Sequence, residues 1–388
     1  MLYSFYLGLI LYISLQCFVV SNNTALKHNI DVYAQYILLI FVLLFLFGFR
    51  GYVFTDWINY NYHFKQTPVL FSEFIENIQI NGIYEIGFNV LQFICKKICN
   101  NYFFFQFINA CIDLILIILI IKDFKIQNVP LFFVTLLAFK GLEIEFNLLR
   151  NSKAIYLFFF SLRYVYEDKS FIKYLIINLI GFLFHASALL FIPIYFILDK
   201  KLSKWFLILL FLILVLIMTL HISLVFSFMG VFLSFVPDGE AIKKLLIYMK
   251  GNQGILFSPI YLERILIYML ILMSYKKLTA NKRTLVLINI YLVYFFFCFF
   301  CWDVEIIVKR GSLLFVPCIW LLFPYFLSFF KTKQFKGLFL ILFLLYCSYK
   351  VYKDCLNNSI LYSYSFCFME SDPIGKAKLY NKVLFGNK

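Results

Sequence analysis

Charged residues are scarce in this 388-residue chain, at 14% of the sequence, whereas 63% of its residues are hydrophobic. A soluble protein of this length needs more polar surface to cover its core. A transmembrane β-barrel needs short segments of alternating hydrophobicity, but this chain has continuous apolar runs such as residues 207–218. Both classes are excluded, and the composition predicts an all-α, polytopic integral membrane protein.

Metal-binding and disulfide patterns are also scarce. The ten cysteines do not make up pairs of Cys-x-x-Cys units and have no histidine partners at metal-ligand spacing, and no Asp-x-Asp motif is present. We therefore expect no metal site and no cofactor, and most cysteines are expected to be small packing residues. Cys355 and Cys367, in the C-terminal tail, could form a disulfide if that tail faces an oxidising compartment.

Arginine is rare among the basic residues: only six of the 35 are arginines, although the net charge is +15. The basic residues gather mainly in short clusters between apolar runs, where they orient helices relative to the cytoplasm and to anionic lipid headgroups. The positive charge therefore indicates membrane topology and not a nucleic-acid partner. Each arginine, in contrast, needs an explanation of its own.

About twelve apolar runs divide the chain, and we interpret them as transmembrane or half-membrane helices of one multi-span domain, residues 1–388. The run at 2–20 has no basic segment before it and no small-residue cleavage site, which predicts a retained helix and not a signal peptide. No inverted repeat and no low-complexity segment is evident. The runs lie near residues 2–20, 32–49, 102–121, 128–142, 147–166, 171–184, 187–198, 204–221, 259–275, 284–301, 311–330 and 335–351.

The basic clusters predict the topology. Lysines and arginines near residues 122–125, 163–173, 200–204, 276–283 and 331–336 face the cytoplasm under the positive-inside rule. Lys173 and Lys200 then lie on the same side, so the stretch 171–198 is predicted to be a hairpin that turns at His185-Ala186-Ser187, and not one long helix. The loops 50–101 and 222–258 and the tail 354–388 then face outward. Within the first of these loops, residues 84–98 form an amphipathic segment at the membrane interface.

Unusual polar residues gather on the outward side in this topology, which predicts a single external cavity. An arginine near hydrocarbon depth costs roughly 2.5–3.5 kcal/mol on insertion scales, so it is usually paired or bound to an anion. The guanidinium group also binds phosphate oxygens bidentately. The outward polar residues are Arg50, Asp56, Glu85, Glu143, Glu145, Arg150, His185, Ser187, Asp303, Glu305, Lys309 and Arg310.

Several of these residues also have a purely structural interpretation. Arg50 would then snorkel at its helix end, Asp56 and Asn59 would cap the next helix, and Glu85 would complement a helix dipole. Arg150 is different, because a cation at a helix N-terminus is unfavourable and an anionic ligand explains it better.

His185 is either a hydrogen-bonded core histidine or a functional residue at the hairpin turn. The neighbouring Ser187 lacks the glycines of a nucleophile elbow. Gln106, Asn109 and Asp113 share one helix face and either hydrogen-bond to neighbouring helices or relay protons, and hydrogen bonding is favoured.

Four short motifs occur in series: Phe49-Arg50 with Thr55-Asp56-Trp57-Ile58-Asn59-Tyr60, then Glu85-Ile86-Gly87-Phe88, then Leu148-Leu149-Arg150-Asn151 with Ala154, and then His185-Ala186-Ser187-Ala188-Leu189. In order, spacing and predicted membrane side they resemble the EpsG-like branch of the Wzy-type polysaccharide polymerases. The resemblance covers roughly residues 1–200, with Arg310 as a looser fifth point. Ile86 stands where the family usually has proline, and Asn151 stands where it commonly has glutamine.

The resemblance implies a metal-independent glycosyltransferase on the outer face of the bacterial cytoplasmic membrane. It would join oligosaccharide repeat units carried on undecaprenyl pyrophosphate into O-antigen, capsule or exopolysaccharide. Such a reaction needs cations for the diphosphates, aromatic rings and hydrogen-bonding groups for the sugars, and a base for the acceptor hydroxyl. We expect Arg50, Arg150 and Arg310 in the first role, Tyr52, Trp57, Asn59, Tyr60 and Ser187 in the second, and Asp56, Glu85 or His185 in the third.

Two other functions stay open at this point. An O-antigen-ligase-like transferase also has outward arginines and a histidine, but it moves its glycan to a different lipid. A flippase for lipid-linked glycans would distribute charges over both leaflets and show internal symmetry, which the one-sided clustering disfavours. The expected partners are the lipid-linked oligosaccharides and the bilayer, and a chain-length regulator and a flippase of the same pathway are further protein partners to test.

Overall fold

The computed structural model describes residues 3–22, 30–81, 84–225, 227, 259–330, 332–370 and 373–385. Within these ranges the regular secondary structure is helical, and a single antiparallel β-bridge joins Arg50 to Phe366. The all-α class predicted from composition is therefore confirmed. All ten cysteines are free thiols, including Cys355 and Cys367.

Three helices among the described residues are long and apolar enough to cross a membrane: α6 (Tyr102–Asp123), α17 (Lys282–Phe300) and α20 (Lys333–Asn357). A bent pair, α18 (Glu305–Phe315) and α19 (Pro317–Ser328), would add a fourth span, with an angle of 52° between its halves. These helices support a membrane protein, but the prediction of about twelve spans is not confirmed. Shorter apolar helices are α7 (Val129–Ala138), α11 (Phe171–Phe182), α13 (Lys204–Thr219) and parts of α1 (Tyr3–Asn22) and α2 (Ile30–Gly48).

Two compact units make up the structure. The first contains Met1–Pro193 and Phe323–Lys388, and the second contains Ile194–Leu322. The prediction of one multi-span domain stays a prediction. The remaining helical segments of the first unit are α3 (Trp57–Gln66), α4 (Phe71–Asn81), α5 (Ile86–Ile98), α8 (Gly141–Asn147), α9 (Asn151–Ser161), α10 (Arg163–Tyr166), η2 (Ala186–Phe191), η3 (Cys367–Met369) and α21 (Pro373–Phe385).

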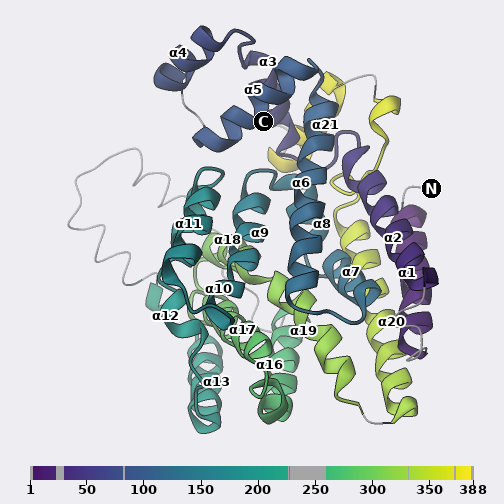
Figure 1. The fold of residues 1–388 in the computed structure, drawn as a ribbon, viewed down its shortest axis with the longest axis vertical. Coiled ribbons are helices and arrows are strands. Elements are labelled where there is room, and N and C mark those ends of the chain that lie inside the picture. Colours follow the sequence, from purple (N-terminus) through teal and green to yellow (C-terminus); the bar gives the residue numbers. More distant parts are fainter. Residues whose placement is uncertain are drawn as a thin grey trace. The chain divides into compact units, whose positions relative to one another are not determined.

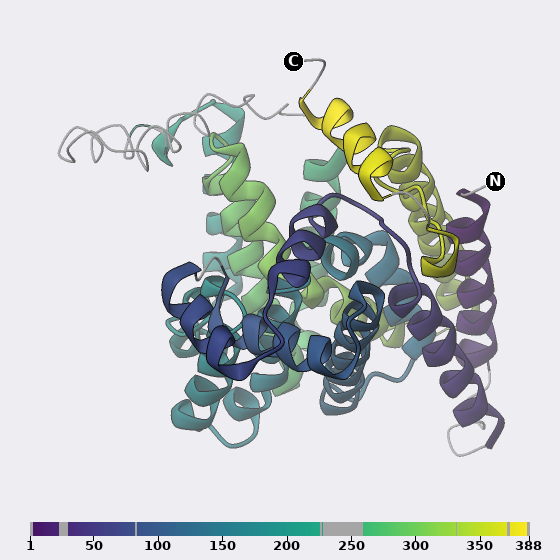
Figure 2. The same cartoon turned by 90° about the horizontal axis from the view of Figure 1, so that it is seen from above.

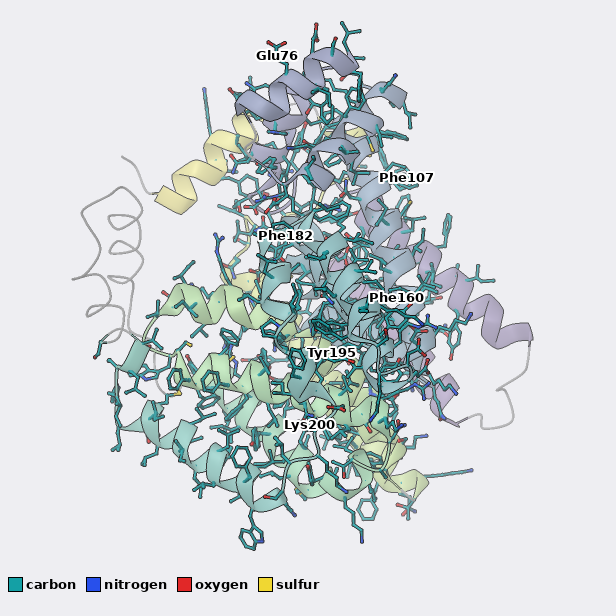
Figure 3. All side chains as sticks on the ribbon, turned by 60° about the vertical axis from the view of Figure 1, so that its left-hand side comes forward. Glu76, Phe107, Phe160, Phe182, Tyr195 and Lys200 are labelled. Carbon is teal, nitrogen blue, oxygen red and sulfur yellow. The ribbon has the colours of Figure 1, made fainter. Side chains whose placement is uncertain are left out.

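The first unit is built on the packing of α6 against α9 and of α9 against α11. Helix α2 packs on α6, and α1 packs on α7 and α20. Helices α3, α4 and α5 lie together beyond the N-terminal end of α6, at the top of Figure 1, and Figure 2 shows them from above. We call these three helices the cap. In Figure 3, Glu76 on α4 lies at the far tip of the cap, and Phe182 at the end of α11 lies below it.

The stretch 171–193 reverses direction, as the topology predicts. Helix α11 ends at Phe182, and after a turn the 3₁₀ helix η2 packs back against it. The hydroxyl of Tyr174, near the start of α11, donates to the carbonyl of Phe191 at the end of η2, over 2.6 Å. This bond between the two arms is possible only in a hairpin. A short helix, α12 (Tyr195–Leu198), follows in the second unit.

Helix α5 coincides with the predicted amphipathic segment. One side of it packs into the cap through residues that include Phe88 and Gln92. Four apolar residues spaced four apart remain exposed along another side, in a stripe of Ile86, Val90, Ile94 and Ile98. Residues at this spacing share a helix face, so α5 is amphipathic in the way an interfacial helix requires. Its position at a membrane interface stays a prediction.

The second unit contains α12, α13, α16 (Pro259–Leu278), α17 and α18. Helices α13, α16 and α17 pack on one another. Asn289 of α17 donates to the carbonyls of Leu198 over 2.7 Å and Lys200 over 2.9 Å, which satisfies the C-terminal end of α12. Buried Arg264 of α16 donates to the hydroxyl of Tyr294 over 3.1 Å. The predicted loop at 222–258 lies almost entirely outside the described residues.

Candidate active site

The motif that begins at Arg50 leads into helix α3, and the N-terminus of this helix is bonded by a residue distant in the sequence. The Oδ1 atom of Asn147, at the end of α8, accepts hydrogen bonds from the backbone N–H groups of Thr55 over 3.1 Å and Asp56 over 2.9 Å. Asp56 itself makes no side-chain capping bond. Its negative charge instead helps to raise the pKa of the hydroxyl groups of Tyr60 and Tyr84. Asn147 therefore does the capping that the structural interpretation assigned to Asp56.

Glu85 and Arg150 form an ion pair with 2.5 Å between Oε2 and a guanidinium nitrogen. The other oxygen, Oε1, accepts the backbone N–H of Ala186 over 3.1 Å. Burial alone would raise the pKa of this carboxyl, but a hydrogen bond from its own backbone, the charge of Arg150 and the N–H of Ala186 together lower it. Glu85 is thus an ionised carboxylate that joins α5, α9 and the hairpin turn.

Gly87 explains why α5 reaches the hairpin turn so closely. Its N–H donates to the carbonyl of Leu183 over 2.8 Å. A Cβ atom at this position would lie 2.7 Å from that same carbonyl oxygen, which real Cβ atoms do not tolerate. The glycine after Glu85-Ile86 therefore lets the Glu85 carboxylate reach both Ala186 and Arg150.

The hairpin turn holds His185 in a defined orientation. Its Nδ1 atom accepts the backbone N–H of Ser187 over 3.1 Å and lies 2.8 Å from the hydroxyl oxygen of the same serine. That hydroxyl donates to Oδ1 of Asn151 over 2.7 Å. The asparagine that replaces the family's usual glutamine thus keeps a hydrogen bond to the turn.

Arg150 lies on an aromatic surface at the start of α9. Its guanidinium is 4.3 Å from the ring centre of Tyr84, and the Tyr60 hydroxyl lies beside it. The side chain is 21% exposed, and its Nε atom is buried without a hydrogen-bond partner among the described residues. The guanidinium is therefore held by Glu85 and by the two tyrosines, and about a fifth of the side chain remains exposed.

Arg50 is placed differently. The side chain is 2% exposed, one guanidinium nitrogen donates to the carbonyl of Phe47, and the group stacks 5.1 Å above the ring of Phe146. No ion pair to Arg50 is found in the part of the chain that the structure describes. Glu145 and Asp113 are the carboxylates whose charges act on it.

The C-terminal segment covers the backbone on both sides of Arg50. The N–H of Gly51 donates to the carbonyl of Ser365 over 2.7 Å, and the N–H of Cys367 donates to the carbonyl of Phe49 over 2.9 Å. The diphosphate role of Arg50 stays a prediction, and in this conformation residues 361–370 would have to move for a ligand to reach it.

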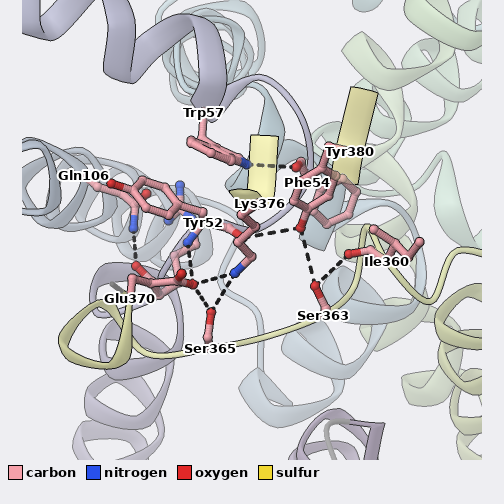
Figure 4. A network of polar contacts seen from close by, with 11 residues as sticks. Tyr52, Phe54, Trp57, Gln106, Ile360, Ser363, Ser365, Glu370, Lys376 and Tyr380 are labelled. Carbon is pink, nitrogen blue, oxygen red and sulfur yellow. Dashed lines mark hydrogen bonds and ion pairs between the residues drawn. The ribbon is translucent and has the colours of Figure 1, made fainter. Parts of the chain in front are cut away.

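Tyr52 and Trp57 are packed between α3, α6 and this C-terminal segment. Their rings stack with centroids 4.1 Å apart, and the indole N–H donates to the carbonyl of Phe54 over 3.1 Å. Figure 4 shows the surrounding network, in which Oε1 of Glu370 accepts the N–H of Tyr52 over 3.2 Å and pairs with Lys376 over 2.5 Å. Both rings are buried in this conformation, and their sugar-binding roles are untested. The predicted sugar ligand Asn59, in contrast, is exposed.

The polar residues of α6 form hydrogen bonds and an ion pair. The amide of Gln106 donates to the carbonyl of Arg50 over 2.6 Å, and that of Asn109 donates within its own helix to Phe105. Asp113 pairs with Lys153 of α9 over 2.8 Å, and both side chains are 1% exposed. Gln106 and Asp113 therefore bond to other segments, as the hydrogen-bonding interpretation predicts, whereas the amide of Asn109 donates within α6.

Arg310 belongs to the second unit, and its place in the site stays a prediction. It is exposed on α18, one residue after Lys309, which pairs with Glu305 over 2.6 Å. A cavity of about 700 Å³ lies between α1 and α2, and its lining is apolar. It contains none of the predicted site residues, so the predicted external polar cavity also stays a prediction. The lining residues are Gly8, Leu9, Tyr12, Leu38, Phe41, Val42 and Phe45.

The amino-acid sequence was compared with models of known protein families. The sequence profile of the EpsG family matches residues 33–366. The chain belongs to the EpsG family. No curated protein and no solved structure matches it. The match extends beyond residue 200 and includes the second unit.

Several residues around the candidate site were not predicted as site residues from the sequence. Tyr84 lies under Arg150, and Asn147 caps α3 from another helix. His63 of α3 hydrogen-bonds to Gln92 of α5 over 2.6 Å. The chain has only four histidines, so a survey of every histidine would have included His63.

Proposed function

We propose that this EpsG-family protein is a polysaccharide polymerase, a glycosyltransferase that joins oligosaccharide repeat units carried on undecaprenyl pyrophosphate. The donor glycan leaves its lipid diphosphate and is transferred to the non-reducing end of a new lipid-linked unit. The site faces the outside of the cytoplasmic membrane in this proposal, as the distribution of lysines predicts.

Arg150 is the observation that carries the proposal. A polymerase must hold a diphosphate that gains negative charge as it leaves the sugar, and guanidinium groups bind such oxygens well. Arg150 is fixed on one side by Glu85, lies against Tyr84 and Tyr60, and is partly open to solvent. These are the properties expected of a preorganised anion ligand.

The other residues around Arg150 suit sugar recognition and proton transfer. Tyr60 and Tyr84 provide ring surface and hydroxyl groups beside the guanidinium. Ser187 and Asn151 provide hydrogen-bonding groups at the hairpin turn. Asp56 is half-buried near the two tyrosines and remains a candidate for proton transfer. Arg50 and Arg310 remain proposed diphosphate ligands, after Arg150.

The proposal is tested by the lipid-linked products of cells that lack this gene and carry Arg150→Ala. We expect the wild-type gene to restore long polymer, and Arg150→Ala to accumulate single repeat units on the lipid carrier at the outer face. Arg163→Ala is the matched control, because Arg163 pairs with Asp123 over 3.6 Å and does not contact Glu85.

Other outcomes would identify the alternative functions. Repeat units that stay on the cytoplasmic face would indicate a flippase, and a glycan moved to a different lipid would indicate a ligase-like transferase. Long polymer at wild-type levels with Arg150→Ala would contradict the assignment of the site.

A further inference from the structure

His63 is a half-buried histidine in the last turn of α3, and its ring is oriented by a buried amide. Its Nδ1 atom lies 2.6 Å from Oε1 of Gln92, whose side chain on α5 is fully buried. An amide oxygen only accepts hydrogen bonds, so Nδ1 carries the proton in this arrangement. The Nε2 atom of the neutral ring then has a free lone pair, as a general base requires.

The ring lies next to the proposed diphosphate ligand. Its centroid is 4.5 Å from that of Tyr84, and the guanidinium of Arg150 lies 4.3 Å from the same tyrosine ring. Burial and the positive charge of Arg150 lower the pKa of His63, although the bond to Gln92 opposes them. The ring is therefore neutral at physiological pH. Asp56 and Glu85 are the carboxylates whose charges act on Tyr84, the ring that His63 contacts, and the ammonium group of Lys96 bonds to the carbonyls of Phe64 and Lys65, which follow His63.

In His185 the proton of the neutral ring lies on the other nitrogen. A backbone N–H can only donate, so the bond from Ser187 to Nδ1 makes that atom an acceptor and leaves the proton of the neutral ring on Nε2. Both oxygens of Glu85 are already bonded, to Arg150 and to Ala186. A carboxylate such as Asp56 has an ordinary pKa roughly 2–3 units below that of histidine, which makes it a weaker base at neutral pH.

We propose that His63 is the general base of the transfer reaction, and that His185 acts as a hydrogen-bond donor. This inference rests on the proposed polymerase function. The acceptor sugar's O–H bond breaks and its proton passes to Nε2 of His63, while the acceptor oxygen forms a bond to the anomeric carbon of the donor. The bond from that carbon to the diphosphate oxygen breaks, and its electron pair leaves with the diphosphate, whose charge Arg150 binds. His63 then releases its proton to water.

The test uses the full-length protein in proteoliposomes with its lipid-linked repeat unit as donor and acceptor. We expect His63→Ala and His63→Gln to lower kcat by about 10²–10⁴-fold, the usual contribution of a general base, with a much smaller change in KM. In wild type, kcat/KM should fall as the pH drops through a pKa below about 6.5, because the base becomes protonated there. His63→Ala should lose this acidic limb, and added imidazole should restore part of its rate. Lys65→Ala, an exposed neighbour on α3, is the matched control.

A second variant keeps the proposal testable if the His63 variants do not fold. Gln92→Glu retains an acceptor beside Nδ1 and adds a negative charge, so the acidic limb should move to higher pH. No movement of that limb would overturn the proposal, and so would a His63→Ala protein with near-normal kcat and an unchanged acidic limb. Both results would leave the polymerase function standing. A wild-type protein that does not polymerise the lipid-linked unit would overturn the function itself.

Discussion

Two ion pairs on helix α9 show how the same chemistry serves different purposes in one unit. Lys153 pairs with Asp113 of α6 inside the helix bundle, where both side chains are 1% exposed. Arg150, one turn earlier on the same helix, pairs with Glu85 at the edge of the cap, where about a fifth of each side chain is exposed. The first pair is enclosed by protein, and the second is open on one side.

The donors of the two pairs are used differently. Lys153 and Ser152 both donate to the same carboxylate oxygen of Asp113, over 2.8 and 3.0 Å. Arg150 uses one nitrogen for Glu85 and keeps a buried Nε without a partner in the described residues. Asp113 Oδ1 of the inner pair is likewise buried without a hydrogen-bond partner in the described residues. The two pairs therefore differ in exposure: the inner pair is enclosed between two helices, whereas the outer pair can be reached from solvent.

The largest effect is expected from removing one member of the inner pair. Lys153→Met leaves the Asp113 carboxylate buried without its cation, which should lower the free energy of unfolding by about 3–5 kcal/mol. This change is measured by titrating the purified protein in mixed micelles with a denaturing detergent and recording its unfolding. Lys153→Met combined with Asp113→Leu removes both charges and should recover most of the loss. A single variant as stable as the wild type would show that the inner pair does not hold α6 to α9.

A large loss of activity with little loss of stability is expected at the outer pair. Arg150→Lys keeps the positive charge but loses the planar fork that binds two oxygens at once. We expect polymer formation to fall by about 10²-fold, which corresponds to roughly 2.7 kcal/mol. The free energy of unfolding should change by less than about 1 kcal/mol, because the pair is partly exposed. Reconstituted transfer assays and the same unfolding titration measure both quantities. An Arg150→Lys protein that loses stability and activity together would remove the contrast between the pairs.

The sequence predicted the general class of the molecule better than its internal contacts. Low charge and long apolar runs were enough to predict an all-α membrane protein. The clusters of basic residues were enough to predict the hairpin that turns near His185. The motifs also contained the residues that the structure joins, since Glu85 contacts both Arg150 and Ala186. What each of these residues does in the reaction is still a prediction.

The remaining contacts depend on how helices are packed, which a local pattern does not specify. Pairing of Asp113 with Lys153 depends on the rotation and height of α6 against α9. The bond from His63 to Gln92 likewise depends on how α3 lies against α5. Arg50 was predicted to face a ligand, but residues more than 300 positions later cover it through the bridge to Phe366. Only the folded chain shows such contacts.

An intermediate effect is expected at Lys96 of α5, which bonds to the C-terminal end of α3 inside the cap. Its ammonium group donates to the carbonyls of Phe64, Lys65 and Thr67 over 2.9, 2.7 and 2.6 Å, and so completes the C-terminal end of α3. Lys96→Met should cost about 1–3 kcal/mol, because these bonds to a charged group are lost. Amide hydrogen exchange at residues 63–67 should rise, and Lys97→Met, at the adjacent exposed residue, is the control. Unchanged exchange in Lys96→Met would show that α3 holds its end without this bond.

The smallest effect is expected from neutralising Glu85, and it should depend on pH. Glu85→Gln keeps an oxygen for the Ala186 N–H but removes the charge that faces Arg150, at a cost below about 1 kcal/mol at neutral pH. Because the folded state lowers the pKa of Glu85, its stabilising contribution is complete above the ordinary value of about 4.5 and is lost as the pH falls through the lower folded value. Unfolding titrations of the two proteins between pH 3 and 7 should therefore converge only at the acidic end. A difference that stays constant across this range would mean that the carboxylate's charge does not stabilise the fold, and that Glu85 positions Arg150 through hydrogen bonding alone.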